Sequence, residues 1–180
     1  GTQHQLKQPF FVMATENPIE MEGTYPLPEA QLDRFLLKIL IEPPDEDVLV
    51  QILDHPTGSA VHDVPKVVDG ETILAMRQLV RDVQIAGPLT RYIARLVRGS
   101  DPTADGACES AKTLLRYGAG VRGGQAVVLA SKVFAMLRGR GHVDFSDIRR
   151  VALPALRHRI IPNFEAEADG IGPDTILGKI

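Results

Sequence analysis

The sequence predicts two parts: the end of an α/β domain, with two strands and a short helix, and then an all-α helical bundle. Two apolar runs, 10–14 and 36–41, have the unbroken hydrophobicity of strands buried on both faces of a parallel sheet. Beyond a Pro-Pro pair the apolar residues recur at helical spacing instead. We therefore divide the chain into 1–43, the end of the first domain, and 44–180, the helical domain.

The two predicted strands need partners. Two strands alone do not make a stable sheet, so we expect the rest of the sheet to come from sequence outside these 180 residues. Segments 10–14 and 36–41 should then contact another molecule or be poorly ordered. A Gly- and Pro-rich loop between them leads to a short helix that ends near Phe35.

The helical part carries start and stop signals along its length. Asp69 and Asp144 are predicted N-caps, and Asp147 can complete a capping box with Asp144. Gly118 is predicted to end one helix. The most apolar helix, 124–138, should lie at the centre of the bundle. The other expected helices cover 44–54, 70–81, 88–98 and 107–117, with two more that begin at 145 and 173.

The composition excludes several classes of protein. Hydrophobic residues make up 44% of the chain, which supports a core and argues against disorder. The net charge of −3 argues against nucleic-acid binding. The single cysteine, Cys108, rules out an internal disulfide and fits a reducing cytosol. The histidines show no metal-ligand spacing, and no signal peptide or membrane-spanning run is present. We expect a cytoplasmic protein with no membrane span and no metal site in this chain.

Asn17 stands where the first predicted strand ends. Pro18 restrains it to extended geometry, so the side chain should project past the carboxyl edge of the sheet, where ligands of α/β sheets bind. An amide there can donate a hydrogen bond to a phosphate oxygen while its carbonyl positions an attacking water. An isolated Asn-Pro is more often only the start of a loop, so this assignment depends on the flanking sequence.

Arg34 ends the short helix within the sequence Leu-Asp-Arg-Phe. Leu32 and Phe35 would anchor the helix end and leave Arg34 pointing outward. A guanidinium group suits the charge that develops on a phosphoryl group during transfer. The alternative is a surface ion pair with Asp33 or Glu29, which would contribute little to stability.

Arg122 lies in a Gly-rich segment just before the most apolar helix. A helix N-terminus favours phosphate through its free N–H groups and dipole, and an arginine adds bidentate hydrogen bonding. Further along, Arg157, His158 and Arg159 form a basic group. We interpret that group as a solvated helix face and not as a site.

Together these segments resemble the AAA+ ATPases of the MoxR family. The resemblance rests on residues 10–35, above all Asn-Pro, Thr-Tyr-Pro-Leu-Pro-Glu-Ala-Gln and Leu-Asp-Arg-Phe, and on Gly-Ala-Gly-Val-Arg-Gly-Gly-Gln around Arg122. It implies that Asn17 is sensor 1, that Arg34 is an arginine finger acting on a neighbouring subunit's nucleotide, and that Arg122 is sensor 2. Val121 stands where the family usually has proline.

The resemblance also implies a homo-oligomeric, hexameric ring that uses ATP and Mg²⁺ in a chaperone-like assembly role. Such proteins work with von Willebrand factor A-domain partners. The chain has no Gly-x-x-x-x-Gly-Lys-(Ser/Thr) motif and no apolar strand that ends in Asp-Glu, the features that hold phosphate and Mg²⁺. We therefore expect the complete protein to hydrolyse ATP and this chain alone to be inactive.

Two alternatives stay open from the sequence. A sister AAA+ class, such as magnesium-chelatase-like subunits or helicase-type ATPases, shares the Asp-Arg-Phe ending but is not expected to keep Thr-Tyr-Pro-Leu-Pro-Glu-Ala-Gln. A non-enzymatic helical interaction module would have no use for the two apolar strands.

Overall fold

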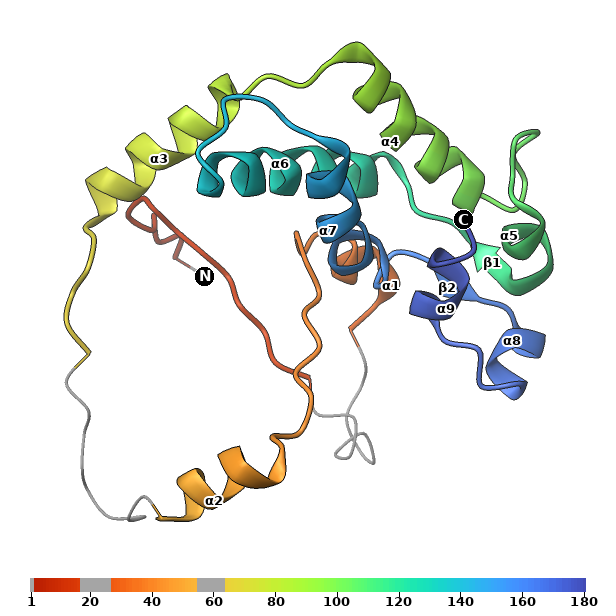
Figure 1. Ribbon diagram of the computed structural model, residues 1–180, viewed down its shortest axis with the longest axis horizontal. Helices are drawn as coiled ribbons and strands as arrows, with labels where there is room; N and C mark the ends of the chain where they lie inside the picture. Colours follow the sequence, from red (N-terminus) through yellow and green to blue (C-terminus); the bar gives the residue numbers. More distant parts are fainter. Residues whose placement is uncertain (1, 17–26, 55–63) are drawn as a thin grey trace.

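The computed structural model describes residues 2–16, 27–54 and 64–180, and most of its regular structure is helical (Figure 1). The sheet in these residues is a pair of short antiparallel strands, β1 and β2. The elements are α1 Glu29–Leu32, α2 Glu46–Asp54, α3 Gly70–Asp82, α4 Gly87–Ser100, α5 Glu109–Leu114, β1 Leu115–Tyr117, α6 Val121–Leu137, α7 Phe145–Leu156, β2 Ile161–Pro162, α8 Phe164–Ala168 and α9 Pro173–Leu177.

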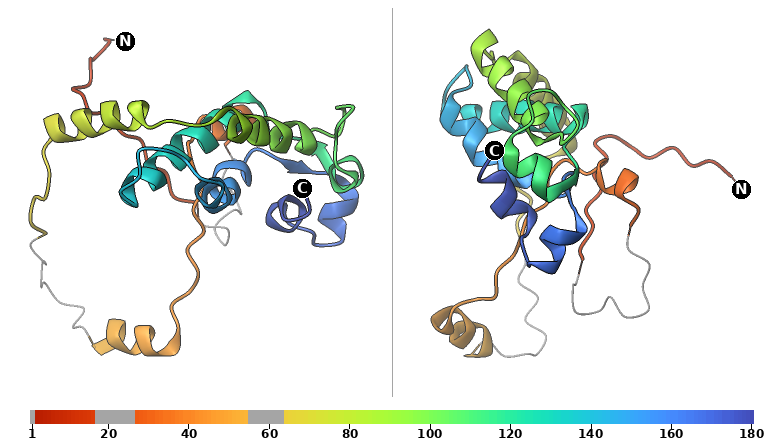
Figure 2. Two further views of the ribbon diagram at one scale, coloured as in Figure 1. Left: turned by 45° about the horizontal axis from the view of Figure 1, so that its top comes forward. Right: turned by 90° about the vertical axis from the view of Figure 1, so that its right-hand side faces the viewer.

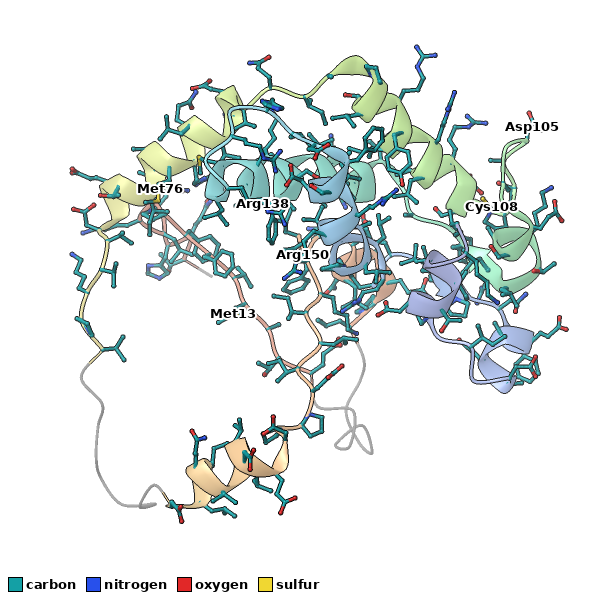
Figure 3. All side chains as sticks on the ribbon, viewed as in Figure 1. Met13, Met76, Asp105, Cys108, Arg138 and Arg150 are labelled. Carbon is teal, nitrogen blue, oxygen red and sulfur yellow. The ribbon has the colours of Figure 1, made fainter. Side chains whose placement is uncertain are left out.

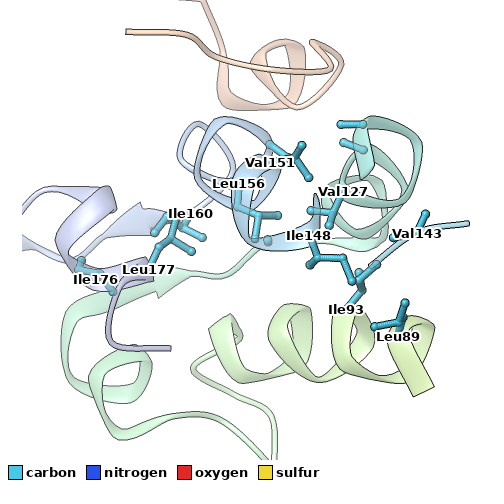
Figure 4. Close-up of a cluster of buried hydrophobic side chains, with 14 of the residues drawn as sticks. Leu89, Ile93, Val127, Val143, Ile148, Val151, Leu156, Ile160, Ile176 and Leu177 are labelled. Carbon is cyan, nitrogen blue, oxygen red and sulfur yellow. The ribbon is translucent and has the colours of Figure 1, made fainter. Parts of the chain in front are cut away.

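The core lies where α6 packs against α7, with α4 alongside them (Figure 4). Val127 of α6, Ile148 and Val151 of α7 and Ile93 of α4 are buried there. Burying each of these side chains contributes about 1.5–3 kcal/mol, and the two helices with the most buried residues supply most of it. The expectation that the most apolar helix lies centrally is confirmed.

Helix α7 begins with the predicted capping box. The Asp144 carboxylate accepts a hydrogen bond from the first turn, and the Asp144 amide donates to Asp147 Oδ2 at 2.9 Å. Asp147 is fully buried, and Arg140 Nη2 donates to its two oxygens at 2.7 and 2.9 Å. Burial raises the pKa of this carboxyl, but the hydrogen bonds lower it more, so the net shift is downward. The carboxylate ties the start of α7 to the turn after α6.

The predicted helix 107–117 is wrong at its C-terminal end. Helix α5 stops at Leu114, and 115–117 form β1, which pairs with β2. The cause is non-local, because Asn163 reaches back to the end of α5. Its amide N–H donates to the Leu114 carbonyl at 2.9 Å, and its side chain donates to the Thr113 carbonyl at 2.7 Å. These bonds occupy carbonyls that a longer helix would have used.

Gly118 serves close packing and does not terminate a helix as predicted. A Cβ atom at this position would overlap the backbone carbonyl of Ser100, so α4 and the segment after β1 touch here. Ser100 Oγ accepts a hydrogen bond from the Ala119 amide at 3.0 Å and holds the two segments together. Only glycine fits this contact without a backbone shift.

Replacing Gly118 by alanine should therefore lower the free energy of unfolding by about 1–3 kcal/mol, as other forced overpackings do. Gly120→Ala is the matched control, because no atom lies within 4 Å of a Cβ built there. Chemical denaturation of both variants would check this. Equal stabilities for the two variants would contradict the close packing at Gly118.

Helix α6 begins at Val121, three residues before the predicted start. Gly123 belongs to the Gly-rich segment that was expected to precede this helix, and glycine is a poor helix former. In the structure it is buried in the first turn, where a Cβ would press on Leu156, Ala119 and Arg159. Tertiary packing against α7 thus overrides local propensity, and Arg122 becomes part of the helix.

The two predicted strands do not form in this chain. Segments 10–14 and 36–41 contain neither strand nor helix, and their apolar side chains are largely exposed, with Met13 at 82% and Ile41 at 93%. Met13 points away from the helices (Figure 3). A strand forms only where a neighbouring strand supplies its hydrogen bonds. Neither segment pairs with another strand among the described residues, so both stay irregular. Of this predicted α/β part, the short helix α1 is present.

The outlying helices add little to the core. Helices α2 and α3 bury no side chain, although both have the predicted positions and Asp69 caps α3 by accepting from the Thr72 amide at 2.8 Å. Helix α2 stands apart from the other helices in each view (Figure 2). Among the residues that the structure describes, no helix is both long and apolar enough to span a membrane.

Candidate functional site

Three helix ends surround an open hollow of about 290 Å³. They are the end of α1, the first turns of α6 and the end of α7 (Figure 1). The hollow is therefore lined by both the first part of the chain and the helical domain. Two of the three predicted site residues line it. The lining residues are Asp33, Arg34, Leu36, Arg122, Gln125, Ala126, Leu129 and Arg159.

Arg34 follows α1 directly, in the turn that closes this short helix. Its amide donates to the Gln31 carbonyl at 3.1 Å, and its side chain is exposed. Among the described residues the guanidinium makes no hydrogen bond or ion pair. The surface pairing with Asp33 or Glu29 that the sequence left open is therefore not seen, and Arg34 stays available to a ligand.

Asp33, the residue that precedes Arg34, forms an ion pair with Arg122. Arg122 Nη1 lies 3.2 Å from Asp33 Oδ2, and Arg122 is 57% exposed. The other carboxylate oxygen of Asp33 accepts from Arg159 Nε at 3.0 Å. The residue next to Arg34 is thus shared between α6 and the end of α7.

The basic group at the end of α7 is not a solvated face, so that interpretation is wrong. Arg159 is only 8% exposed. Arg157 pairs with Asp174 of α9 at 2.8 Å and lies near the Lys38 carbonyl, and His158 contacts the Phe35 carbonyl at 3.0 Å. All three side chains face the segment that follows α1.

Burial shapes the protonation of this group. Burial lowers the pKa of His158, and a carbonyl can only accept, so Nε2 carries the proton. Nδ1 is buried without a hydrogen-bond partner, which also favours the neutral ring. Burial also lowers the pKa of Arg159, and the Asp33 carboxylate opposes that shift. Arg159 remains charged, because arginine keeps its proton in proteins.

Asn17 lies outside the described residues, so the sensor 1 position stays a prediction. Its neighbour Glu16 is described, and its carboxylate lies 2.9 Å from Lys38 Nζ. That ion pair brings the end of the first apolar segment beside the second. Among residues 2–16, 27–54 and 64–180, no group of three or more His, Cys, Asp or Glu side chains could hold a metal ion.

Comparison with known families and proteins matches both parts of the chain. The family described as "ATPase family associated with various cellular activities (AAA)" matches residues 1–37, and the family described as "AAA lid domain" matches residues 109–180. Chaperone MoxR1 of Mycobacterium tuberculosis is 31% identical over the whole chain, and protein MoxR of Paracoccus denitrificans is 33% identical over 92% of it. The chain belongs to the MoxR family of AAA+ ATPases.

The structural comparison supports the same assignment. A crystal structure of a "putative ATPase" from Cytophaga hutchinsonii superposes with a TM-score of 0.86, covers 98% of this chain and is 37% identical. The MoxR-type chain spans about half the length of the proteins it matches: 48% of MoxR1, 52% of the Paracoccus protein and 55% of the solved chain. The predicted combination of an AAA+ core end and a helical lid is confirmed as a fold class, while the boundary at 43/44 remains a prediction.

Two residues of this site, Asp33 and Arg159, were not predicted as site residues from the sequence. A signal for Arg159 was present in the spacing of α7. Val151 and Ala155 are buried, and Arg159 continues that face at the next i+4 step. A basic residue on the buried face of a helix must find acceptors. For Asp33, no local pattern could have indicated a partner that lies 126 residues away.

Proposed function

We propose that this chain provides the arginine finger and the lid-borne phosphate sensor of a MoxR-type ATPase. The observation that carries the proposal is the shared hollow. Arg34 and Arg122 come from segments 88 positions apart and line one open depression. Neither is needed to fill the core, since both side chains are exposed.

The donors around the hollow fit a phosphate group. Three arginines and one aspartate are among the lining residues, so the lining carries excess positive charge. Arg159 is occupied by backbone carbonyls and Asp33, which leaves Arg34 and Arg122 with free donors. Arginine binds phosphate oxygens through two parallel hydrogen bonds, which fixes orientation as well as charge.

In ATP hydrolysis the proposed roles follow from these positions. Arg34 stabilises the charge that develops on the transferred phosphoryl group. Arg122, in the first turn of α6, binds phosphate oxygens together with the positive end of that helix. Asn17, as sensor 1, orients the attacking water. Mg²⁺ would neutralise phosphate charge, held by carboxylates other than those of the described residues.

Because Arg34 and Arg122 share one hollow, we infer that they act on the same nucleotide. The Asp33 ion pair supports this, since it holds Arg122 beside the turn that carries Arg34. If the finger acts on a neighbouring subunit's ATP, the phosphate sensor then acts on that same ATP. A nucleotide site is completed only at an interface between subunits.

The complete protein would then be a ring-forming, hexameric homo-oligomer with a chaperone-like role in assembly, in the cytoplasm. The name of the Mycobacterium tuberculosis relative, Chaperone MoxR1, supports this class of function. A von Willebrand factor A-domain protein is the proposed partner, as the family resemblance implies. No feature of the described surface favours nucleic acid, given the net charge of −3.

The proposal is tested by the dependence of activity on assembly. Because the finger comes from a neighbour, Mg²⁺-dependent ATP hydrolysis per subunit should rise steeply with protein concentration in the range where the complete protein assembles. The 180-residue chain is the control. It should show no turnover above buffer and should bind ATP more weakly than micromolar by calorimetry. Constant activity per subunit across assembly, or turnover by the chain alone, would contradict the proposal.

A further inference from the structure

Arg159 makes an unusual set of contacts for a side chain at a helix end. It donates to the backbone carbonyls of Asp33 at 2.9 Å, Phe35 at 2.6 Å and Leu36 at 3.2 Å. It also bonds the Asp33 carboxylate and the Ala155 carbonyl of α7. One buried guanidinium therefore binds both sides of Arg34 in sequence.

The segment around Arg34 has little else to fix it. Helix α1 is only four residues long and buries no side chain. Apolar packing therefore does not determine where this helix ends. Most of the remaining support is polar and comes from the end of α7: His158 contacts the Phe35 carbonyl, and the Lys38 amide donates to the Pro154 carbonyl at 2.8 Å. The ion pair of Asp33 with Arg122 and the packing of Leu37 against the core add to it.

The chemistry of the guanidinium matters for this arrangement. Its planar fork presents five N–H donors in fixed directions, and the contacts here use Nε, Nη1 and Nη2. A lysine in the same place would keep the charge but could not reach three carbonyls and a carboxylate in these directions. The geometry of residues 33–36 therefore depends on arginine and not simply on a cation.

We propose that Arg159 is the positioning residue for Arg34: by binding the carbonyls on both sides of it, the lid helix α7 sets where the finger points. The inference rests on the proposed function of Arg34 and deepens it. It also makes finger position depend on the lid, because α7 and the finger segment move as one unit while these bonds hold. Arg159 itself touches no substrate.

The test uses Arg159→Lys in the complete protein, alone and combined with Arg34→Ala. A residue that acts through Arg34 should lower kcat by about 10- to 100-fold when Arg34 is present, with KM for ATP changed less than about threefold. In the Arg34→Ala background the same substitution should change the single-turnover rate less than about twofold. The matched control is Arg150→Lys, an exposed position on α7, which should change neither.

A second readout separates positioning from loss of fold. Hydrogen exchange of residues 33–41 in the 180-residue chain should be faster in Arg159→Lys than in the parent, while α4 and α6 exchange as before. If Arg159→Lys does not fold, His158→Leu removes the donor to the Phe35 carbonyl and puts an apolar side chain of similar size in its place. That variant should lower kcat several-fold, again only when Arg34 is present.

The outcomes separate this inference from the proposed function. If Arg34→Ala hydrolyses ATP at the parental rate, the finger assignment fails and the inference fails with it. If Arg34→Ala is inactive but Arg159→Lys has parental kcat, only the positioning role is overturned. An equal loss from Arg159→Lys in both backgrounds would likewise overturn it, because that result marks a general structural role.

Discussion

Replacing Arg34 by alanine should lower ATP hydrolysis by the complete protein by about 10³-fold or more while ATP binding stays near normal. Arginine fingers act on the charge of the transition state, so their loss affects kcat far more than affinity. The structure adds that Arg34 is exposed and has no ion pair among the described residues. Its removal should therefore cost the fold little, and loss of activity would not reflect unfolding.

Mixing subunits tests whether Arg34 acts on a neighbour. The Arg34→Ala protein is combined with a variant that lacks the catalytic carboxylate of its own nucleotide site. At mixed interfaces an intact site meets an intact Arg34, so activity should partly recover. Arg150→Ala, an exposed arginine on α7, serves as the control and should hydrolyse ATP at the parental rate. If co-assembly is proven and the mixture shows only the sum of its two inactive components, Arg34 does not act on the adjacent subunit.

Local signals made most of the helical domain predictable. Asp69 and the Asp144–Asp147 pair bond backbone groups in the first turn of their own helices. These caps can therefore be predicted without knowing the rest of the fold. The end of α5 was not predictable in this way, because Asn163 ends it from a point 49 residues beyond Leu114. Element type thus followed from periodicity, while this boundary depended on tertiary structure.

The site was predictable for similar reasons, and only in part. Arg34 and Arg122 lie in segments with a family pattern, and the structure brings them to one hollow. Asp33 and Arg159 join them through contacts that span 89 and 126 residues. The spacing after α7 indicates that Arg159 is buried, but no pattern in a single sequence indicates which residue it contacts. The strands 10–14 and 36–41 failed for a further physical reason: the apolar pattern was correct, but a strand forms only where a partner supplies its hydrogen bonds.

The second large effect concerns Arg122. Arg122→Ala removes a charge-assisted contact to phosphate, worth about 1.5–3 kcal/mol, which corresponds to about ten- to 150-fold in affinity or turnover. The Asp33 ion pair reduces this little, since exposed pairs contribute about 0–1 kcal/mol. Asp33 keeps its bond to Arg159 in the variant, so the segment that carries Arg34 should stay in place. Nucleotide titration and steady-state kinetics on the complete protein measure the change, and parental values for both would remove Arg122 from the site.

A mixture of Arg34→Ala and Arg122→Ala subunits decides whether the two arginines serve one nucleotide. If both reach the same neighbouring ATP, each mixed interface lacks one of them, and mixing should restore no activity. If Arg122 instead acted on its own subunit's ATP, an Arg34→Ala subunit would keep its sensor and receive Arg34 from an Arg122→Ala neighbour. Those interfaces would be complete and activity would partly recover. The shared hollow and the ion pair between Asp33 and Arg122 predict no recovery, since both arginines belong to one surface of one chain.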